Sequence, residues 1–110
     1  MNNYVKIMPE FMANPIWDKD GIMMSWANLD LKDDHLLNRL AVWNHEWEQN
    51  QDTLTGAFSN KEAIESRGLQ LAKYVKFYKA SWTVEYYTED GTLEITVGEP
   101  MWIKYSESNK

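Results

Sequence analysis

The chain has 110 residues and a formal net charge of −6 at pH 7, with six Trp, six Tyr, three Phe and no Cys. This length suits one hydrophobic core, so we predict a single domain over residues 1–110. The aromatic content argues against a disordered acidic chain, and the lack of Cys excludes disulfides, Cys-based zinc sites and thiol nucleophiles.

The acidic residues are unevenly distributed along the chain. Residues 1–58 hold nine acids against four bases, whereas the two signs nearly balance in the rest. An acidic surface repels phosphate backbones and attracts basic proteins, so we expect a basic protein partner and no nucleic acid. The surplus charge points to the first half for such a partner. The alternative is that these acids only keep the domain soluble.

Targeting signals are not evident in the sequence. The first residues lack the basic and apolar regions of a secretory signal, and no apolar run approaches the roughly 18 residues of a membrane span. We therefore expect a soluble, cytoplasmic protein that makes no membrane contact. The absence of Cys fits a reducing compartment.

The first third of the chain predicts one strand and a long loop. Tyr4 to Met8 is rich in β-branched and aromatic residues, which predicts the strand. Residues 10–31 contain turn signals at Asn14-Pro15 and at Asp18 to Gly21, which predict a structured loop. Ile22 to Trp26 is a candidate for a second short strand.

Two amphipathic helices follow. The first is predicted over about residues 33–51, because its apolar residues fall three or four apart. These residues are Leu36, Leu40, Trp43 and Trp47. Ser59 to Glu62 has the pattern of a capping box and predicts the start of a second helix, which continues to about Lys79. Gly68 within that helix predicts close packing against a neighbouring element.

The last third predicts a β-hairpin. Apolar and polar residues alternate over 82–87 and again over 93–97, and Asp90-Gly91 supplies the turn between them. Residues 101–105 are a candidate for a further strand. The predicted fold class is α+β, with two amphipathic helices packed on one face of a small antiparallel sheet.

Catalytic and metal-binding motifs are incomplete. Asp18 to Gly21 resembles the start of a calcium loop, but Met23 and Leu29 stand where that loop needs glycine and glutamate, so we predict a turn. His45-Glu46 resembles a zinc-protease helix, but Gln49 replaces its second histidine. We therefore expect no metal, no cofactor and no catalytic residue. A small enzyme assembled from distant residues is an alternative.

The acidic and aromatic first half is the candidate partner-binding site. Carboxylates bind Arg and Lys of a partner, and Trp is a common anchor of such surfaces. For each residue the alternative is a role in the core, in a cap or in a turn. The candidate residues are Trp17, Asp18, Asp20, Asp30, Asp33, Asp34, Glu46 and Glu48.

Over about residues 4–88 the chain resembles a family of small acidic bacterial proteins that share a strand, a Pro-hydrophobic-Trp turn and a Leu-rich helix with downstream Trp. Members often have Ser-Pro before the long helix, where this chain has Lys32 and Asp33, so its capping differs. The matching residues are Val5 to Glu10, Pro15 to Asp18, Leu29 to Leu31, Leu36 to Leu40, Trp43, Trp47 and Tyr86.

In size, acidity and predicted architecture the chain is also similar to immunity proteins of contact-dependent growth inhibition and other bacterial toxin systems. This resemblance implies that it binds a cognate toxin domain, frequently a nuclease, and blocks its active site or its access to substrate. We expect a monomer that forms this complex. The alternative is a structural or adaptor domain that self-associates through exposed aromatic residues such as Phe77 and Trp102.

Overall fold

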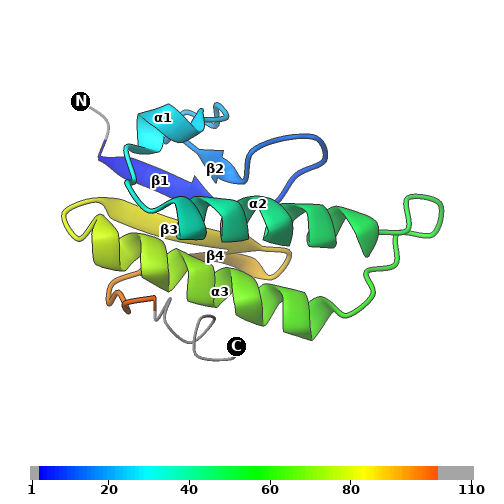
Figure 1. Ribbon diagram of the computed structural model, residues 1–110. Helices are drawn as coiled ribbons and strands as arrows, with labels where there is room; N and C mark the ends of the chain where they lie inside the picture. The colour runs from blue at the N-terminus through cyan, green and yellow to red at the C-terminus, as the bar shows by residue number, and fades with distance from the viewer. Residues whose placement is uncertain (1–2, 102–110) are drawn as a thin grey trace, which may run out of the picture.

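A computed structural model of the protein describes residues 3–101, which form two layers, a sheet and the helices beside it (Figure 1). The predicted α+β class is confirmed. The strands of this range are β1 (Tyr4–Ile7), β2 (Ile16–Trp17), β3 (Thr83–Thr88) and β4 (Gly91–Ile95), and its helices are α1 (Trp26–Leu29), α2 (Asp34–Gln49) and α3 (Lys61–Tyr78).

The sheet is mixed, so the prediction of an antiparallel sheet with two helices was wrong in both respects. The strand order is β2-β1-β3-β4. β1 pairs antiparallel with β2 but parallel with β3, and β3 pairs antiparallel with β4. The third helix is α1, a single turn that precedes the two predicted helices.

The path of the chain explains the parallel pair. β2 returns toward the start of β1, and α2 and α3 then run in opposite directions, so the chain comes back to the same end of the sheet (Figure 1). β3 therefore begins beside the start of β1 and runs the same way. Because β2 has already returned the chain to the start of β1, two antiparallel helices bring it back to that same end, whereas one helix would leave it at the opposite end.

Two local predictions also need correction. Ile22 to Trp26 forms no strand: Met23 makes an isolated bridge to Trp17, and α1 begins at Trp26. The capping box is not formed, because Asn60, with φ of 57°, is the N-cap of α3 and makes no side-chain cap hydrogen bond. The predicted strand over 101–105 lies outside the described residues except for Met101, which is buried.

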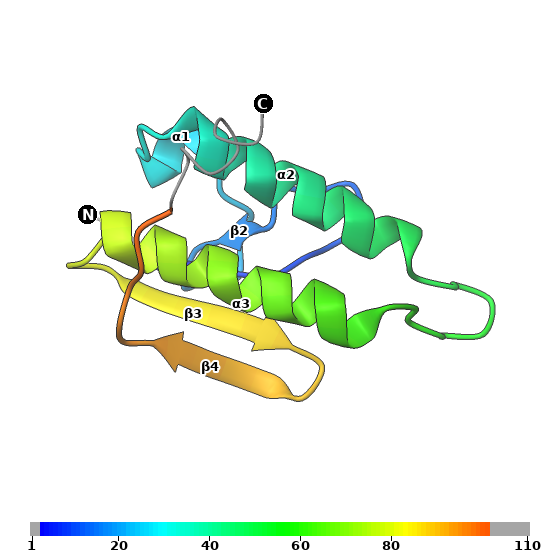
Figure 2. The same ribbon diagram turned by 60° about the horizontal axis from the view of Figure 1, so that its bottom comes forward.

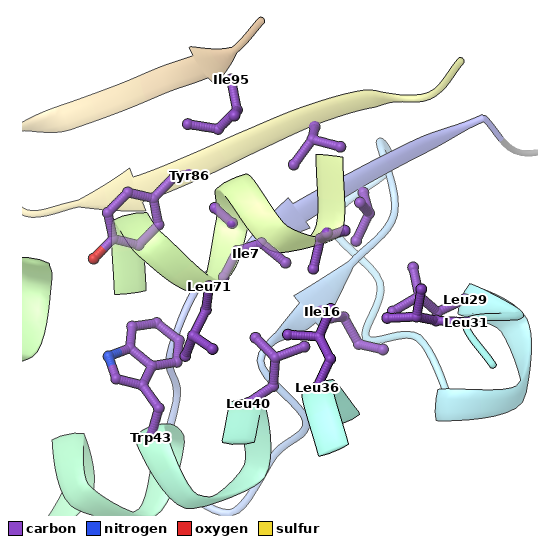
Figure 3. Close-up of a cluster of buried hydrophobic side chains, with 14 of the residues drawn as sticks. Ile7, Ile16, Leu29, Leu31, Leu36, Leu40, Trp43, Leu71, Tyr86 and Ile95 are labelled. Atoms are coloured by element: carbon purple, nitrogen blue, oxygen red, sulfur yellow. The ribbon is translucent and has the colours of Figure 1, made fainter. Parts of the chain in front are cut away.

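The core lies between the sheet and the two long helices. Figure 2 shows α2 and α3 on the same side of the sheet, and Figure 3 shows their apolar side chains meeting those of the strands. Alternate strand residues face the helices, which gives the period of two expected of a sheet covered on one face. The fully buried or nearly buried strand residues are Val5, Ile7, Ile16, Val84, Tyr86 and Ile95.

Gly68 is a point of close approach between α3 and two of its neighbours. A Cβ atom at this position would overlap the Tyr86 hydroxyl from β3 and the Trp43 ring from α2. Trp43 Nε1 donates to the Ile64 carbonyl oxygen at 2.8 Å, and the Tyr86 hydroxyl donates to the Glu65 carbonyl oxygen, also at 2.8 Å. The predicted close packing at Gly68 is therefore confirmed, and two hydrogen bonds accompany it.

Replacing Gly68 by Ala should destabilise the protein, because overpacking of a well-filled core costs about 1–3 kcal/mol. The gain in helix propensity from Gly to Ala, about 1 kcal/mol, offsets only part of this cost. Chemical denaturation measures the free energy of unfolding. Ser66→Ala, at an exposed position two residues away, is the matched control and should leave it within about 0.5 kcal/mol. A Gly68→Ala protein as stable as the parent would contradict the packing.

Glu65 should make stability depend on pH. Burial, opposed by Lys61 and reinforced by Asp90 and Glu89, raises the pKa of Glu65 above its ordinary 4.5. The folded state thus disfavours the ionised carboxylate, and the unfolding free energy falls as the pH rises through the raised pKa. Glu65→Gln should raise the melting temperature at pH 7, with the gain vanishing below pH 4.5. The exposed Glu62→Gln should show no such gain; equal melting of parent and Glu65→Gln would refute the assignment.

Candidate partner-binding site

A buried asparagine anchors the loop between β1 and β2 onto α2. Asn44 is 5% exposed and is the buried polar residue of the described core. Its Oδ1 accepts from the Glu10 N–H at 2.9 Å, and its Nδ2 donates to the carbonyl oxygens of Glu10 and Ala13, both at 3.0 Å. One side chain therefore satisfies three backbone groups and fixes the loop against the helix.

The anchored loop presents Met12 to solvent. Met12 is 96% exposed and has a φ of 53°. Its N–H donates to Glu48 Oε2 on α2, and the neighbouring Phe11 ring lies 4.9 Å from the Trp47 ring, centroid to centroid. A left-handed backbone costs a non-glycine residue about 1 kcal/mol. The loop accepts this cost while it holds a large apolar side chain in water, and both features are typical of functional sites.

A second turn lies beside this loop. Asp18 Oδ1 accepts from the N–H groups of Asp20 and Ile22 at 2.9 and 3.0 Å, and Gly21 takes a φ of 79°. The predicted turn at Asp18 to Gly21 is therefore confirmed. It leaves Ile22 62% and Met23 47% exposed.

Two hollows join these features into one surface. The first, of about 680 Å³, lies over Asp18, Asp30 and Trp82, and the second, of about 310 Å³, lies between the Met12 loop and α2. Met23 lines both, so they adjoin. We call the combined region the N-terminal surface; it comprises Met12, Asp18, Ile22, Met23, Asp30 and Glu48.

Three of the eight predicted site residues line this surface, namely Asp18, Asp30 and Glu48. Asp20 stands in the turn beside it and is exposed. Trp17 is half-buried, and its Nε1 donates to the Met8 carbonyl oxygen at 2.9 Å, so it supports the start of the Met12 loop.

The other three predicted residues do not join them. Asp33 is the N-cap of α2 and accepts from the Leu36 N–H at 3.1 Å, and Asp34 lies in the first turn, where a carboxylate favours the positive end of the helix dipole. Glu46 projects from a different side of α2 and pairs with Arg67 of α3. The acids of the first half are thus divided between the N-terminal surface, a helix start and a groove between the helices.

Basic side chains lie beside the carboxylates of the N-terminal surface and reduce its net negative charge. Lys79 Nζ donates to the Asp30 carbonyl oxygen at 2.8 Å and lies 5.0 Å from the Trp82 ring centroid. Lys32 lies 3.9 Å from the Asp30 carboxylate, with both side chains well exposed. His45 lies 3.5 Å from Glu48. The carboxylates of Asp18 and Glu48 each bind backbone N–H groups as well, so they are held in fixed positions around the apolar side chains.

Three further observations concern self-association through aromatic residues, a metal site and a membrane span. Phe77 is 47% exposed and stacks edge to face on Tyr78 at 5.2 Å, while Trp102 lies outside residues 3–101. Within that range no three His, Asp or Glu side chains are grouped closely enough to hold a metal ion. No helix of the same range is long and apolar enough to cross a membrane.

No protein-family model matches the chain, and no curated protein matches its sequence significantly.

Removing the amide of Asn44 should loosen the Met12 loop. Asn44→Ala leaves a buried N–H and two carbonyl groups without their partner, which costs about 1–3 kcal/mol for a buried group. We expect lower stability and, by hydrogen exchange, faster exchange of the Glu10 amide. Asn38→Ala on an exposed position of α2 is the control. Unchanged exchange at Glu10 in Asn44→Ala would show that the anchor is unimportant.

Proposed function

We propose that the protein is an immunity protein that binds and neutralises a basic bacterial toxin domain through the N-terminal surface. The observation that carries this proposal is Met12, an almost fully exposed apolar side chain that the loop holds in a strained backbone conformation. Apolar surface held in water is favourably buried when a partner covers it.

The fixed loop favours tight binding. Ordering a flexible loop or side chain at an interface costs free energy, and a loop that is already anchored avoids much of that cost. The three hydrogen bonds of Asn44 and the bond from Met12 N–H to Glu48 supply the anchor. Ile22 and Met23 extend the apolar area beside Met12, and Met side chains adapt well to a partner surface.

The charge around these apolar residues favours a basic partner. Asp18, Asp30 and Glu48 line the same hollows as Met12, Ile22 and Met23. An apolar centre with a charged rim is the usual anatomy of a protein interface. The net charge of −6 also accelerates the encounter with a basic protein, and this effect weakens as salt is added. Nuclease domains carry basic surfaces for their substrates, so they fit this partner class.

Co-expression with the product of the adjacent reading frame tests the proposal. We expect this chain to rescue growth and to co-purify with that product. We also expect the two proteins to associate more slowly as salt is added. Met12→Asp should weaken the complex at least tenfold, because it places a charge at a buried anchor of the interface.

Leu54→Asp is the matched control. Leu54 is 95% exposed, close to the 96% of Met12, but it lies in the loop between α2 and α3 and outside the N-terminal surface. It should leave the affinity and the growth rescue unchanged. The proposal fails if the neighbouring product neither binds nor is neutralised, or if the two variants weaken binding equally.

A further inference from the structure

A groove of about 490 Å³ runs between α2 and α3, away from the N-terminal surface. The hollow beside the Met12 loop and this groove are lined by different residues of α2, so the helix separates them. The polar walls of the groove include His35, Arg39 and Glu46 from α2 and Arg67, Gln70 and Tyr74 from α3. Residues three or four apart project on the same side of a helix, which is why these rows face each other.

The groove brings together the guanidinium groups of the chain. Both arginines of the chain line it, although the net charge of the chain is −6. A guanidinium presents its N–H donors in a planar fork that matches a carboxylate in shape, which an ammonium group cannot do. None of the lysines of residues 3–101 lines the groove. The basic side chains placed here are thus the ones suited to bind a planar anion.

Arg67 pairs with a carboxylate of the protein itself. Glu46 of α2 bridges the groove to Arg67 of α3, with the two side chains 41% and 52% exposed. An ion pair this exposed to water contributes at most about 1 kcal/mol, so an incoming carboxylate replaces Glu46 at little cost. Glu46 therefore occupies the place of a ligand.

Apolar groups lie next to the arginines. Trp43 and Leu71 form a closed floor, at 3% and 6% exposure, and the Trp43 N–H is already bonded to Ile64. Val42 is 59% exposed on one side, and Tyr74 is half-buried on the other. These surfaces suit the apolar body of a ligand whose charged end reaches Arg67. The volume lies within the range of small-molecule sites.

We propose that the groove between α2 and α3 binds a small organic carboxylate with an apolar body. The carboxylate pairs with Arg67 in place of Glu46 and with Arg39 across the groove, and the body lies against Val42, Tyr74 and the Trp43 floor. This site is separate from the N-terminal surface and does not depend on the function proposed for it.

Titration of the full-length protein with 4-phenylbutyrate, followed by NMR chemical shifts that include the Trp43 indole N–H, tests the site. The uncharged 4-phenylbutyramide should not bind, which isolates the role of the carboxylate. Phenyl phosphate tests whether the site takes a phosphate instead. Tighter binding of phenyl phosphate than of 4-phenylbutyrate would overturn the assignment to carboxylates.

Three variants of the groove should change the affinity for 4-phenylbutyrate in opposite directions. Arg39→Gln and Arg67→Gln should each weaken 4-phenylbutyrate several-fold, because each loses a charge-assisted hydrogen bond. Glu46→Gln should tighten it several-fold, because it removes the competing carboxylate. Lys73→Gln is the matched control: Lys73 pairs with Glu99 at 3.5 Å outside the groove, so the affinity should not change.

The sign of the Glu46→Gln effect keeps the proposal falsifiable even if an arginine variant folds poorly. Unchanged or weaker binding in Glu46→Gln would overturn it. Equal binding of the amide, or an equal loss in Lys73→Gln, would overturn it as well, since either result would show that the two arginines do not select the ligand.

Discussion

The contact of α2, α3 and β3 at Gly68 positions the other elements of the protein. Because α3 carries no side chain there, the Trp43 ring from α2 and the Tyr86 ring from β3 reach it together, with their centroids 6.2 Å apart. Each also donates a hydrogen bond to a carbonyl oxygen of α3. This contact fixes the position of α2 against the sheet, and α2 in turn carries Asn44 toward the Met12 loop and Arg39 toward the groove.

Local patterns were enough to predict the two long helices and the hairpin, because their apolar periods are regular and Gly68 interrupts a helix stripe. The parallel pairing of β1 and β3 could not be predicted in this way. It depends on β2, whose two residues carry no detectable period, and on the return of the chain through α2 and α3. The Ser59 to Glu62 pattern favoured Ser59 as N-cap, but Asn60 takes that position with a left-handed backbone that the pattern does not include.

The candidate site was predictable only in its charges. Asp18 and Asp30 stand out as acids beside turn and helix signals, and the structure places both at the N-terminal surface. Asn44 and Met12 gave no signal, because a helical Asn and a loop Met are common in sequence. Their roles arise from a tertiary contact that buries one and exposes the other. Asp33 shows the opposite case, in which a prominent acid serves as a helix cap.

Under the proposed function, the left-handed backbone at Met12 sets fold stability against partner binding at a single position. Glycine adopts a φ of 53° without strain, so it would suit this backbone better than the residue present. Selection for fold stability alone would favour glycine there, together with the loss of the protruding thioether. An engineer who optimises the domain for heat resistance would thus remove the most exposed apolar side chain of the loop. Calorimetry would record the gain in stability, while the proposed complex would lose affinity.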